Sequence, residues 1–385
     1  MSHNQNIPDI TLVGDWAVHD KCGIKFNHKS KYLLLNFEGP VALKNNKKIN
    51  KAGPIIKNIE FPQINNSILN LANNHFMDYG AANAKKNIRE IKKKKYKYVG
   101  FGNNLIQSRK EVVLNLSQKV AIIGCTEPQF GMSKPDQAGV TEVGPWIIEK
   151  IQKLKKKYKI IIISIHGSLE TSPFPIPDTQ DLYRSWIDVG ASVIHGHHSH
   201  VPQGYEKYKD GHIFYGLGNF CVDPDKWTDH ENNRWSLVVD IFLKDKLKIK
   251  IKYFEIKKKN SEIIISQNNS KKYINYFKVV NAVINDRLKL TNIWNEFSLN
   301  IFNNFGRKYV DWDKKPIKTR LKNLCKELLN MNKASLKYRL LLYYHMMSLD
   351  SHRLMLKKAT SILCGENIYK SKYKIKKLIK KYCYL

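Results

Sequence analysis

Four histidines fall within six residues of one segment, which reads GASVIHGHHSH from Gly190 to His200. The segment begins with an apolar, β-branched stretch, so the histidines lie at or just beyond the end of a predicted strand. Imidazole is the commonest protein ligand for transition metals, and a strand-end loop can direct several imidazoles to one point. The run therefore favours a structured metal centre, with a solvated or non-specific metal-scavenging histidine loop as the alternative.

Polar residues that could bind metal or phosphate follow nearly every predicted strand in the first 220 residues. The strands are predicted at 10–13, 32–35, 68–72, 120–123, 160–165, 192–195 and 212–215. The polar residues that follow them include, in chain order, Asp15, Asn36, Glu38, Asn73, Asn74, His75 and His166. Because functional groups in α/β folds gather at the carboxyl ends of strands, we expect these side chains to converge on one crevice.

Carboxylate, amide and imidazole groups make up this set, and no thiolate accompanies them. Such a mixed oxygen and nitrogen donor set suits Mn, Fe, Co or Zn in a reactive centre better than a structural zinc site. Two ions about 3.5–4 Å apart, bridged by a carboxylate, would clamp a phosphoryl oxygen and lower the pKa of a bound water to about 7. The residues therefore predict hydrolytic chemistry, with one or two divalent ions, Mn, Fe or Zn, as cofactors.

Alternating strand-like and helix-like segments predict an α/β domain over residues 1–268. Helices are predicted at 82–94 and 145–157, and a β-hairpin over 235–254 is predicted to close the domain. After the hairpin the apolar spacing becomes helical, with stripes at 290–301, 321–329, 336–347 and 375–382. We therefore predict a separate, basic, all-helical region over residues 269–385, of open role.

The chain has 385 residues, and 66 basic against 33 acidic residues give it a formal net charge of +33. So strong a field attracts anionic partners: an anionic substrate or polymer, an anionic membrane surface or nucleic acid. The excess can equally be solvated surface, because Lys, Asn, Ile and Tyr are abundant together, as in A/T-rich coding sequences. Nucleic acid is the least supported partner, since no binding motif accompanies the charge and the lone G-x-G at 100–102 is too short to indicate a nucleotide site.

The six cysteines are scattered without a C-x-x-C pair, which indicates reduced thiols rather than a zinc ribbon or a disulfide framework. No apolar run approaches the roughly 20 residues needed to span a bilayer, and the first ten residues lack the blocks of a signal peptide. We expect a cytoplasmic protein. Lysines around the predicted helix at 375–382 offer a peripheral contact with the inner face of the membrane, while oligomerisation is another role open to the C-terminal helices.

Six motifs, in this order along the chain, resemble the bacterial capsule-synthesis CapA/PgsA family, which is related to the calcineurin-like metallophosphoesterases. They are Gly14-Asp15, NFEGP at 36–40, ANNHFMDYG at 72–80, SIHGSLE at 164–170, GASVIHGHHSHVPQGYE at 190–206 and FYGLGNF at 214–220. The resemblance covers roughly residues 9–255. It implies a metallophosphoesterase-like sandwich of two mixed β-sheets flanked by helices, and a role in poly-γ-glutamate capsule production.

The resemblance also implies roles for individual residues. The implied metal ligands are Asp15, Glu38, Asn74, His166, His198 and His200. Glu38 would bridge two ions, and His75, next to Asn74, would act as general acid or phosphate stabiliser. His197 is either an alternative to His198 as ligand or a partner that supports the ligands.

Other polar residues near the motifs are predicted to have supporting roles. Glu170 and Asp78 would support a ligand or cap a helix rather than bind metal. The asparagines Asn36, Asn73 and Asn219 could support the site or simply cap turns, and turn capping is favoured for the last two.

Two functional hypotheses follow from the sequence. The first is a metal-dependent, phosphoesterase-like hydrolase in capsule or surface-polymer biosynthesis, in which His198 and His200 are the favoured ligands of the histidine run and His195 is not a ligand. The second is a non-catalytic capsule assembly factor, which keeps the same fold as a scaffold and binds an anionic polymer through its basic surface.

Overall fold

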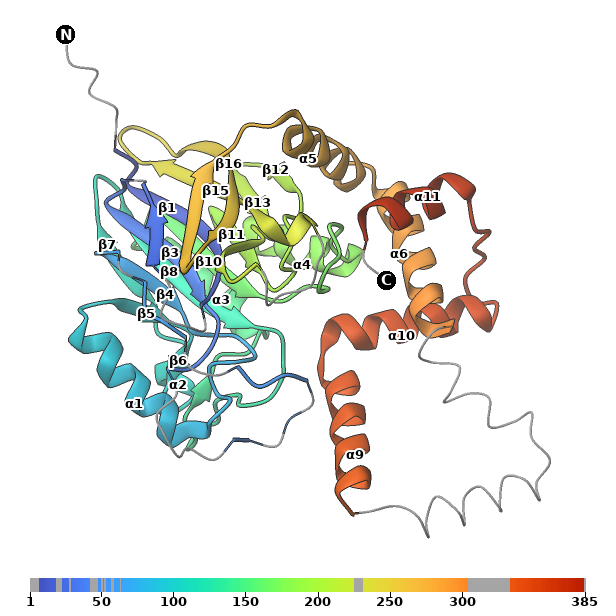
Figure 1. The fold of residues 1–385 in the computed structure, drawn as a ribbon, viewed down its shortest axis with the longest axis horizontal. Helices are drawn as coiled ribbons and strands as arrows, with labels where there is room; N and C mark the ends of the chain where they lie inside the picture. Colours follow the sequence, from blue (N-terminus) through green and yellow to red (C-terminus); the bar gives the residue numbers. More distant parts are fainter. Residues whose placement is uncertain are drawn as a thin grey trace. The chain divides into compact units, whose positions relative to one another are not determined.

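The computed structural model describes residues 7–18, 23–27, 29–41, 48–49, 51, 53–56, 59–62, 64–224, 231–303 and 333–383. By its contacts the chain divides into two compact units, Met1–Ile49 with Ile55–Arg287, and Asn50–Pro54 with Leu288–Leu385. The first unit holds the β-sheets and all candidate site residues (Figure 1). The described part of the second unit is mainly helical.

A nine-stranded mixed sheet forms one layer of the first unit. Its main path runs in the spatial order β2 (Gly23–Phe26), β17 (Glu262–Gln267), β16 (Lys248–Lys259), β15 (Trp235–Phe242), β1 (Ile10–Ala17), β3 (Tyr32–Phe37), β4 (Ser67–Asn70) and β5 (Lys97–Val99). A further strand, β14 (Asn219–Val222), pairs with β1 off this path. Because β1, β3, β4 and β5 are parallel, their carboxyl ends meet at one end of the sheet.

A six-stranded sheet forms the second layer. Its spatial order is β12 (Tyr205–Tyr208), β13 (Gly211–Phe214), β11 (Val193–His197), β10 (Ile160–His166), β8 (Lys119–Thr126) and β7 (Val112–Asn115). The four central strands are parallel, and the two edge strands, β12 and β7, run antiparallel to their neighbours. A short pair, β6 (Phe101–Gly102) with β9 (Gly139–Val140), lies outside both large sheets.

The two large sheets face each other and are flanked by helices, which confirms the predicted fold class. Hydrogen bonds join them directly: His195 in β11 bonds to the Val13 carbonyl in β1, and Asn70 in β4 bonds to the Ser164 carbonyl in β10. All seven residues of β10 are buried, as expected for an apolar strand covered on both faces. The flanking elements are α1 (Gly80–Lys93), α2 (Leu105–Ser108), α3 (Trp146–Lys155), α4 (Pro177–Asp188), α5 (Lys271–Ile284) and the short 3-10 helix η1 (Glu231–Arg234).

All seven predicted strands are present, with ends that differ by a few residues. The strand predicted at 192–195 continues to His197, so two histidines of the run lie inside β11. The prediction that the hairpin over 235–254 closes the domain is wrong, because a turn at Asn260, whose φ is 56°, leads into a third strand, β17. This strand pairs with β16 on one side and with β2 on the other.

The second unit contains most of α6 (Arg287–Ile301), together with α9 (Lys333–Ser348), α10 (Asp350–Leu363) and α11 (Tyr373–Tyr382). The predicted helices at 290–301, 336–347 and 375–382 are present, while the stripe at 321–329 lies outside the described residues. In α11 the apolar residues Ile375 and Ile379 are buried, and the lysines are exposed. No helix in the described parts of the chain is long and apolar enough to cross a bilayer.

Helix α5 belongs to the first unit, although it follows residue 268. Its Tyr276 hydroxyl donates to the Pro202 carbonyl, and its Asn281 side chain accepts from the Tyr205 backbone. These contacts fix the chain between the histidine loop and β12.

Gly14 allows a close approach of two backbone segments where the candidate site begins. β1 passes so close to a neighbouring turn that a Cβ atom on Gly14 would lie 1.8 Å from the Gly218 carbonyl oxygen. The backbone N–H of Asp15 donates to this same oxygen at 3.0 Å. The pairing register of β1 also shifts around Asp15, against both β3 and β14. The absence of a side chain at position 14 therefore places Asp15.

We expect Gly14→Ala to lower the free energy of unfolding by about 2 kcal/mol or more, because the added methyl group must push β1 away from backbone atoms. Urea denaturation measures this change. The control is Gly23→Ala, whose Cβ would meet only the flexible Glu262 side chain, at 3.1 Å, and which should change stability little. Equal stability of the two variants would contradict the close approach.

Candidate metal centre

Six side chains meet where parallel strands of both sheets end. They are Asp15 in β1, Glu38 directly after β3, Asn74 after β4, His166 at the end of β10, and His198 and His200 after β11. The two carboxylates and His166 are fully buried, and the other two histidines are at most 5% exposed. The structure therefore brings together all the residues that the motifs proposed as ligands.

Two groups of potential ligand atoms share one carboxylate. Ligand atoms of Asp15, Glu38 and His166 lie within 4.8 Å of one another, and so do those of Glu38, His198 and His200. The Oε1 atom of Glu38 lies 3.6 Å from His166 Nε2 and 3.7 Å from His200 Nε2. Glu38 therefore has the position that a bridge between two ions requires.

Asn74 joins the first group through His166. Its Oδ1 atom lies 3.0 Å from His166 Nε2, so the amide oxygen and the ring nitrogen are directed toward each other. The other ring nitrogen of His166 lies 3.0 Å from Asn36 Nδ2, which also donates to Asp15 Oδ1 at 2.9 Å. Asn36 thus supports two candidate ligands. Of the two roles left open for it, support of the site and turn capping, these contacts fit the first.

Asn219 orients His200. Its Oδ1 atom lies 2.9 Å from His200 Nδ1, which leaves Nε2 as the ring nitrogen closer to Glu38. The Asn219 amide group is itself held by a hydrogen bond to the Asn233 carbonyl at 3.2 Å. Support of this kind fixes the tautomer and the orientation of a ligating histidine. Simple turn capping, the role favoured from sequence, does not describe this contact.

His197 supports Asp15 from inside β11. Its Nδ1 atom lies 3.1 Å from Asp15 Oδ1, and its Nε2 atom lies 3.3 Å from His195 Nδ1 and 3.4 Å from Ser164 Oγ. His195 in turn bonds to the Val13 carbonyl at 2.9 Å. Of the two roles left open for His197, these contacts fit the supporting one, and His195 is placed away from both ligand groups.

His75 is held by a buried carboxylate. Its Nδ1 atom lies 2.9 Å from Asp78 Oδ2, which also accepts from the Ile56 backbone at 2.8 Å. With Nδ1 engaged in this way, Nε2 is the atom through which His75 can act on a substrate. Asn73 caps the turn that contains His75, because its Oδ1 accepts from the backbone N–H groups of His75 and Phe76.

Burial keeps two of the candidate ligands neutral. It lowers the pKa of His166 well below the usual value, and the neighbouring histidines lower that pKa further. Burial also lowers the pKa of His198 to about 4, against a weaker opposing effect of Glu170. Neutral imidazole is the form that binds metal, so neither ring must lose a proton at neutral pH.

The pKa values of Asp15 and His200 shift in the directions expected of an ion pair. Burial alone would raise the pKa of Asp15, but hydrogen bonding and charge interaction with His197, together with His200 and Asn36, hold it below its usual value. Burial alone would lower the pKa of His200, but Glu38 and Asp15 raise it above its usual value. The two carboxylates therefore favour the protonated form of His200, and the histidines favour the ionised form of Asp15.

The histidine loop has an unusual backbone. His198 has a φ of 84° and His200 a φ of 55°, both in the left-handed region that residues with a Cβ rarely adopt. Such strain costs roughly 1–3 kcal/mol per residue and is typical of functional sites.

At the rim, Glu170 lies 3.8 Å from His198 Nε2, with 59% of its side chain exposed, and belongs to neither ligand group.

Sequence reasoning missed Asn70 and Ser164, which tie the two sheets together beneath the site. Asn70 donates to the Ser164 carbonyl at 3.3 Å and accepts from the Ala72 backbone at 3.1 Å. An asparagine inside an otherwise apolar strand was the available signal, because a buried amide requires partners. Ala17, two residues after Asp15, is fully buried and offers no ligand atom, and His19 lies outside the described residues.

A protein-family model described as "Bacterial capsule synthesis protein PGA_cap" matches residues 24–224 of the chain. This chain belongs to that family. The matched segment contains every candidate site residue except Asp15, which lies nine positions before its start and is placed with the others by β1.

Relatives with described roles share this part of the chain. The capsule biosynthesis protein CapA of Bacillus anthracis is 34% identical over 234 residues, which cover 56% of this chain and 55% of the relative. The PGA biosynthesis protein CapA of Bacillus subtilis is 34% identical over 225 residues, covering 56% and 58%. A probable polyglutamine synthesis accessory protein of Mycobacterium tuberculosis is 25% identical over 182 residues, covering 43% and 48%. The chain spans about half the length of the curated relatives it matches.

Because His195 is buried in its neutral form, we expect the stability of the protein to depend on pH. Burial and the nearby His197 lower the pKa of His195 well below its unfolded value, against the opposing Val13 carbonyl. Below about pH 6.5 the unfolded chain therefore binds a proton that the folded chain excludes, and stability falls as pH falls. Urea denaturation of metal-free protein, in the presence of a chelator, should show this loss of unfolding free energy between pH 7 and pH 5. His195→Gln should reduce the slope by up to about 1.4 kcal/mol per pH unit; an unchanged slope would mean that His195 is not held neutral.

Proposed function

We propose that the chain is a metal-dependent hydrolase of the phosphoesterase type that acts in the metabolism of a capsule or glutamate polymer. The observation that carries the proposal is the position of Glu38, a fully buried carboxylate shared by two groups of ligand atoms. The family and the printed roles of the relatives support the biological setting.

The residues present fit divalent ions. Asp15 Oδ2 and His198 Nδ1 are buried and make no hydrogen bond with the described residues. Buried polar atoms of this kind are costly unless a partner satisfies them, and a carboxylate oxygen beside imidazoles is a good donor for Mn, Fe or Zn. Asp15, Asn74 and His166 would hold one ion, His198 and His200 a second, with Glu38 between them.

One or two ions held there would supply a hydroxide at neutral pH and neutralise charge on a phosphoryl oxygen. The protein would supply the remaining steps. His75, fixed by Asp78, would give a proton to the leaving oxygen or bond to a phosphoryl oxygen through Nε2. Asn219 and His197 would keep His200 and Asp15 in place while the substrate binds.

A second candidate function, a non-catalytic assembly factor that binds an anionic polymer, is favoured by the formal net charge of +33. A peripheral contact of α11 with anionic lipid stays a prediction. Because Ile375 and Ile379 are buried, such a contact would use the exposed lysines of α11 and not its apolar face.

Protein reconstituted with Mn or Zn and then desalted should retain one or two ions per chain, as measured by inductively coupled plasma mass spectrometry. Asp15→Ala, His198→Ala and Glu38→Gln should each reduce the retained metal, and Glu38→Gln should affect both ions because the carboxylate is shared. The matched control is Glu262→Gln, an exposed carboxylate in β17. If the reconstituted wild type holds no ion, the proposal is wrong.

Hydrolysis of a generic phosphodiester and a generic phosphomonoester tests the catalytic role. His75→Asn should lower kcat by about 10²-fold or more with metal content unchanged, because it removes the proton donor. Asp78→Asn should cost less, since it only loosens the orientation of His75. Full metal occupancy without turnover of either ester would instead support the assembly factor.

A further inference from the structure

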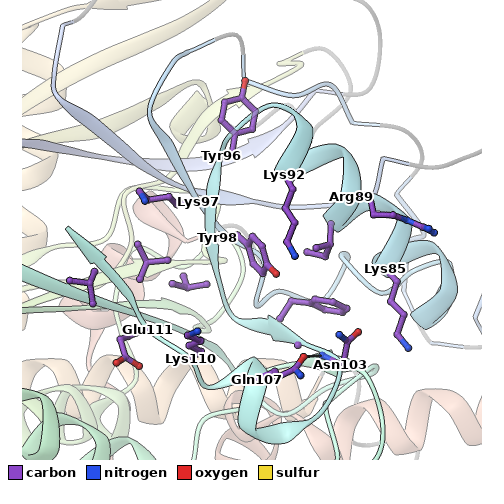
Figure 2. Close-up of a pocket in the computed structure, with 16 residues that line it drawn as sticks. Lys85, Arg89, Lys92, Tyr96, Lys97, Tyr98, Asn103, Gln107, Lys110 and Glu111 are labelled. Atoms are coloured by element: carbon purple, nitrogen blue, oxygen red, sulfur yellow. Dashed lines mark hydrogen bonds between the residues drawn. The ribbon is translucent and has the colours of Figure 1, made fainter. Parts of the chain in front are cut away.

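A large pocket opens on the first unit, between α1, β5 and the connection that leads into β7 (Figure 2). Its volume is about 920 Å³, near the upper end of the range for small-molecule pockets, and no candidate metal ligand lines it. β5 is the last strand of the nine-stranded sheet, and β7 is the last strand of the six-stranded sheet. The pocket therefore lies at the edge of the sandwich where both sheets end; we call it the edge pocket.

The edge pocket is strongly basic. Five cationic side chains line it: Lys85, Arg89, Lys92, Lys97 and Lys110. All five are exposed, and none of them forms an ion pair with a carboxylate among the described residues. The only acidic lining residue, Glu111, is paired with Lys150, and Glu90 of α1 is paired with Lys93. The positive charge of the pocket is therefore available to a ligand.

The cations form a row and do not converge on one point. Lys85, Arg89 and Lys92 follow one another at intervals of four and three residues, so they share one face of α1 and extend over about 10 Å. Figure 2 shows Lys85, Arg89 and Lys92 along this helix, with Lys92 directed toward the ring of Tyr98. Cations that converge on one point suit a single phosphate group. A row of cations suits an extended chain that carries negative charges at regular intervals.

The aromatic residues do not form a platform for nucleic-acid bases. Phe101 is only 4% exposed and packs edge-on against Phe76. Tyr96 packs against Phe61, and its hydroxyl donates to the Pro62 carbonyl. Base stacking needs several open ring faces, so the single half-buried ring of Tyr98 favours a ligand without bases.

Polar groups suited to an amide backbone complete the lining. Asn103 and Gln107 are exposed at one end of the pocket, and Gln107 Oε1 accepts from the Asn103 backbone at 3.2 Å, which leaves its amide hydrogens for a ligand. Burial raises the pKa of Tyr98, so its hydroxyl stays protonated and can donate as well. These groups match the carbonyl oxygens of a polyamide chain.

We propose that the edge pocket binds a segment of an extended polycarboxylate chain, namely a glutamate polymer, separately from the histidine site. The row of cations on α1 pairs with successive carboxylates, and the amides of Asn103 and Gln107 bond to the chain between them. The identity of the polymer rests on the proposed function, but the binding does not depend on the metal chemistry.

Fluorescence anisotropy with labelled poly-γ-glutamate oligomers, at low salt, tests the proposal on the full chain. The variant Lys85→Gln/Arg89→Gln/Lys92→Gln should weaken binding by about tenfold, because three modest charge interactions add. The matched control is Lys86→Gln/Lys93→Gln/Lys153→Gln, which removes the same charge from exposed positions of α1 and α3 that do not line the pocket. The control should change the affinity less than about twofold.

Equal weakening in both variants would overturn the proposal, since diffuse surface charge would then explain the binding. Tighter binding of a single-stranded oligonucleotide of equal charge, lost in the first variant, would overturn it in favour of nucleic acid. Metal content and ester hydrolysis, measured on the same samples, should be unchanged in both. Equal polymer binding by the two variants, in protein that holds its metal, would refute the edge pocket alone. Weakening confined to the first variant, in protein that retains no metal, would refute the hydrolase alone.

Discussion

The burial of two carboxylates, Asp15 and Glu38, is the constraint on which the rest of the site depends. A buried charge is very costly unless positive or hydrogen-bonding groups surround it. The chain supplies such groups from the ends of β3, β10 and β11: Asn36 and His197 on Asp15, His166 on Glu38, and His200 near both. The raised pKa of His200 is a direct effect of the same pair. A divalent ion would place a further compensating positive charge beside both carboxylates.

The histidine run divides according to where β11 ends. His195 and His197 lie two residues apart, on the same face of β11, where they support the β1 backbone and Asp15. His198 and His200 follow it, and their left-handed backbone turns both rings toward Glu38. The end of β11 and two backbone φ angles therefore separate four identical side chains into two roles. Neither the strand end nor the φ angles can be read from residue types, so the sequence left the role of His197 open.

The sequence predicted the central strands and the convergence of the polar side chains at their ends, because buried parallel strands are apolar runs and their polar ends are conspicuous. It missed short or polar edge strands such as β5, β7 and β12, whose position depends on pairing rather than on composition. The contact of Asn219 with His200 joins residues that β12 and β13 separate along the chain, so it was not visible as spacing. The edge pocket was hidden for a related reason: its cations come from separate elements, and a general excess of lysine conceals any one cluster.

The meeting of β5 and β7 at the edge pocket also bears on how the protein avoids self-association. An open edge strand offers unpaired backbone groups to a neighbouring molecule, and lysines placed along it oppose that pairing. Lys97 begins β5, and Lys110 lies two residues before β7. Two of the lysines that line the edge pocket therefore also lie beside the outer strands of the two sheets. Neutralising them, by acylation for example, would leave the sandwich intact but prone to aggregate, and a bound polyanion would take over their protective role by covering both edges.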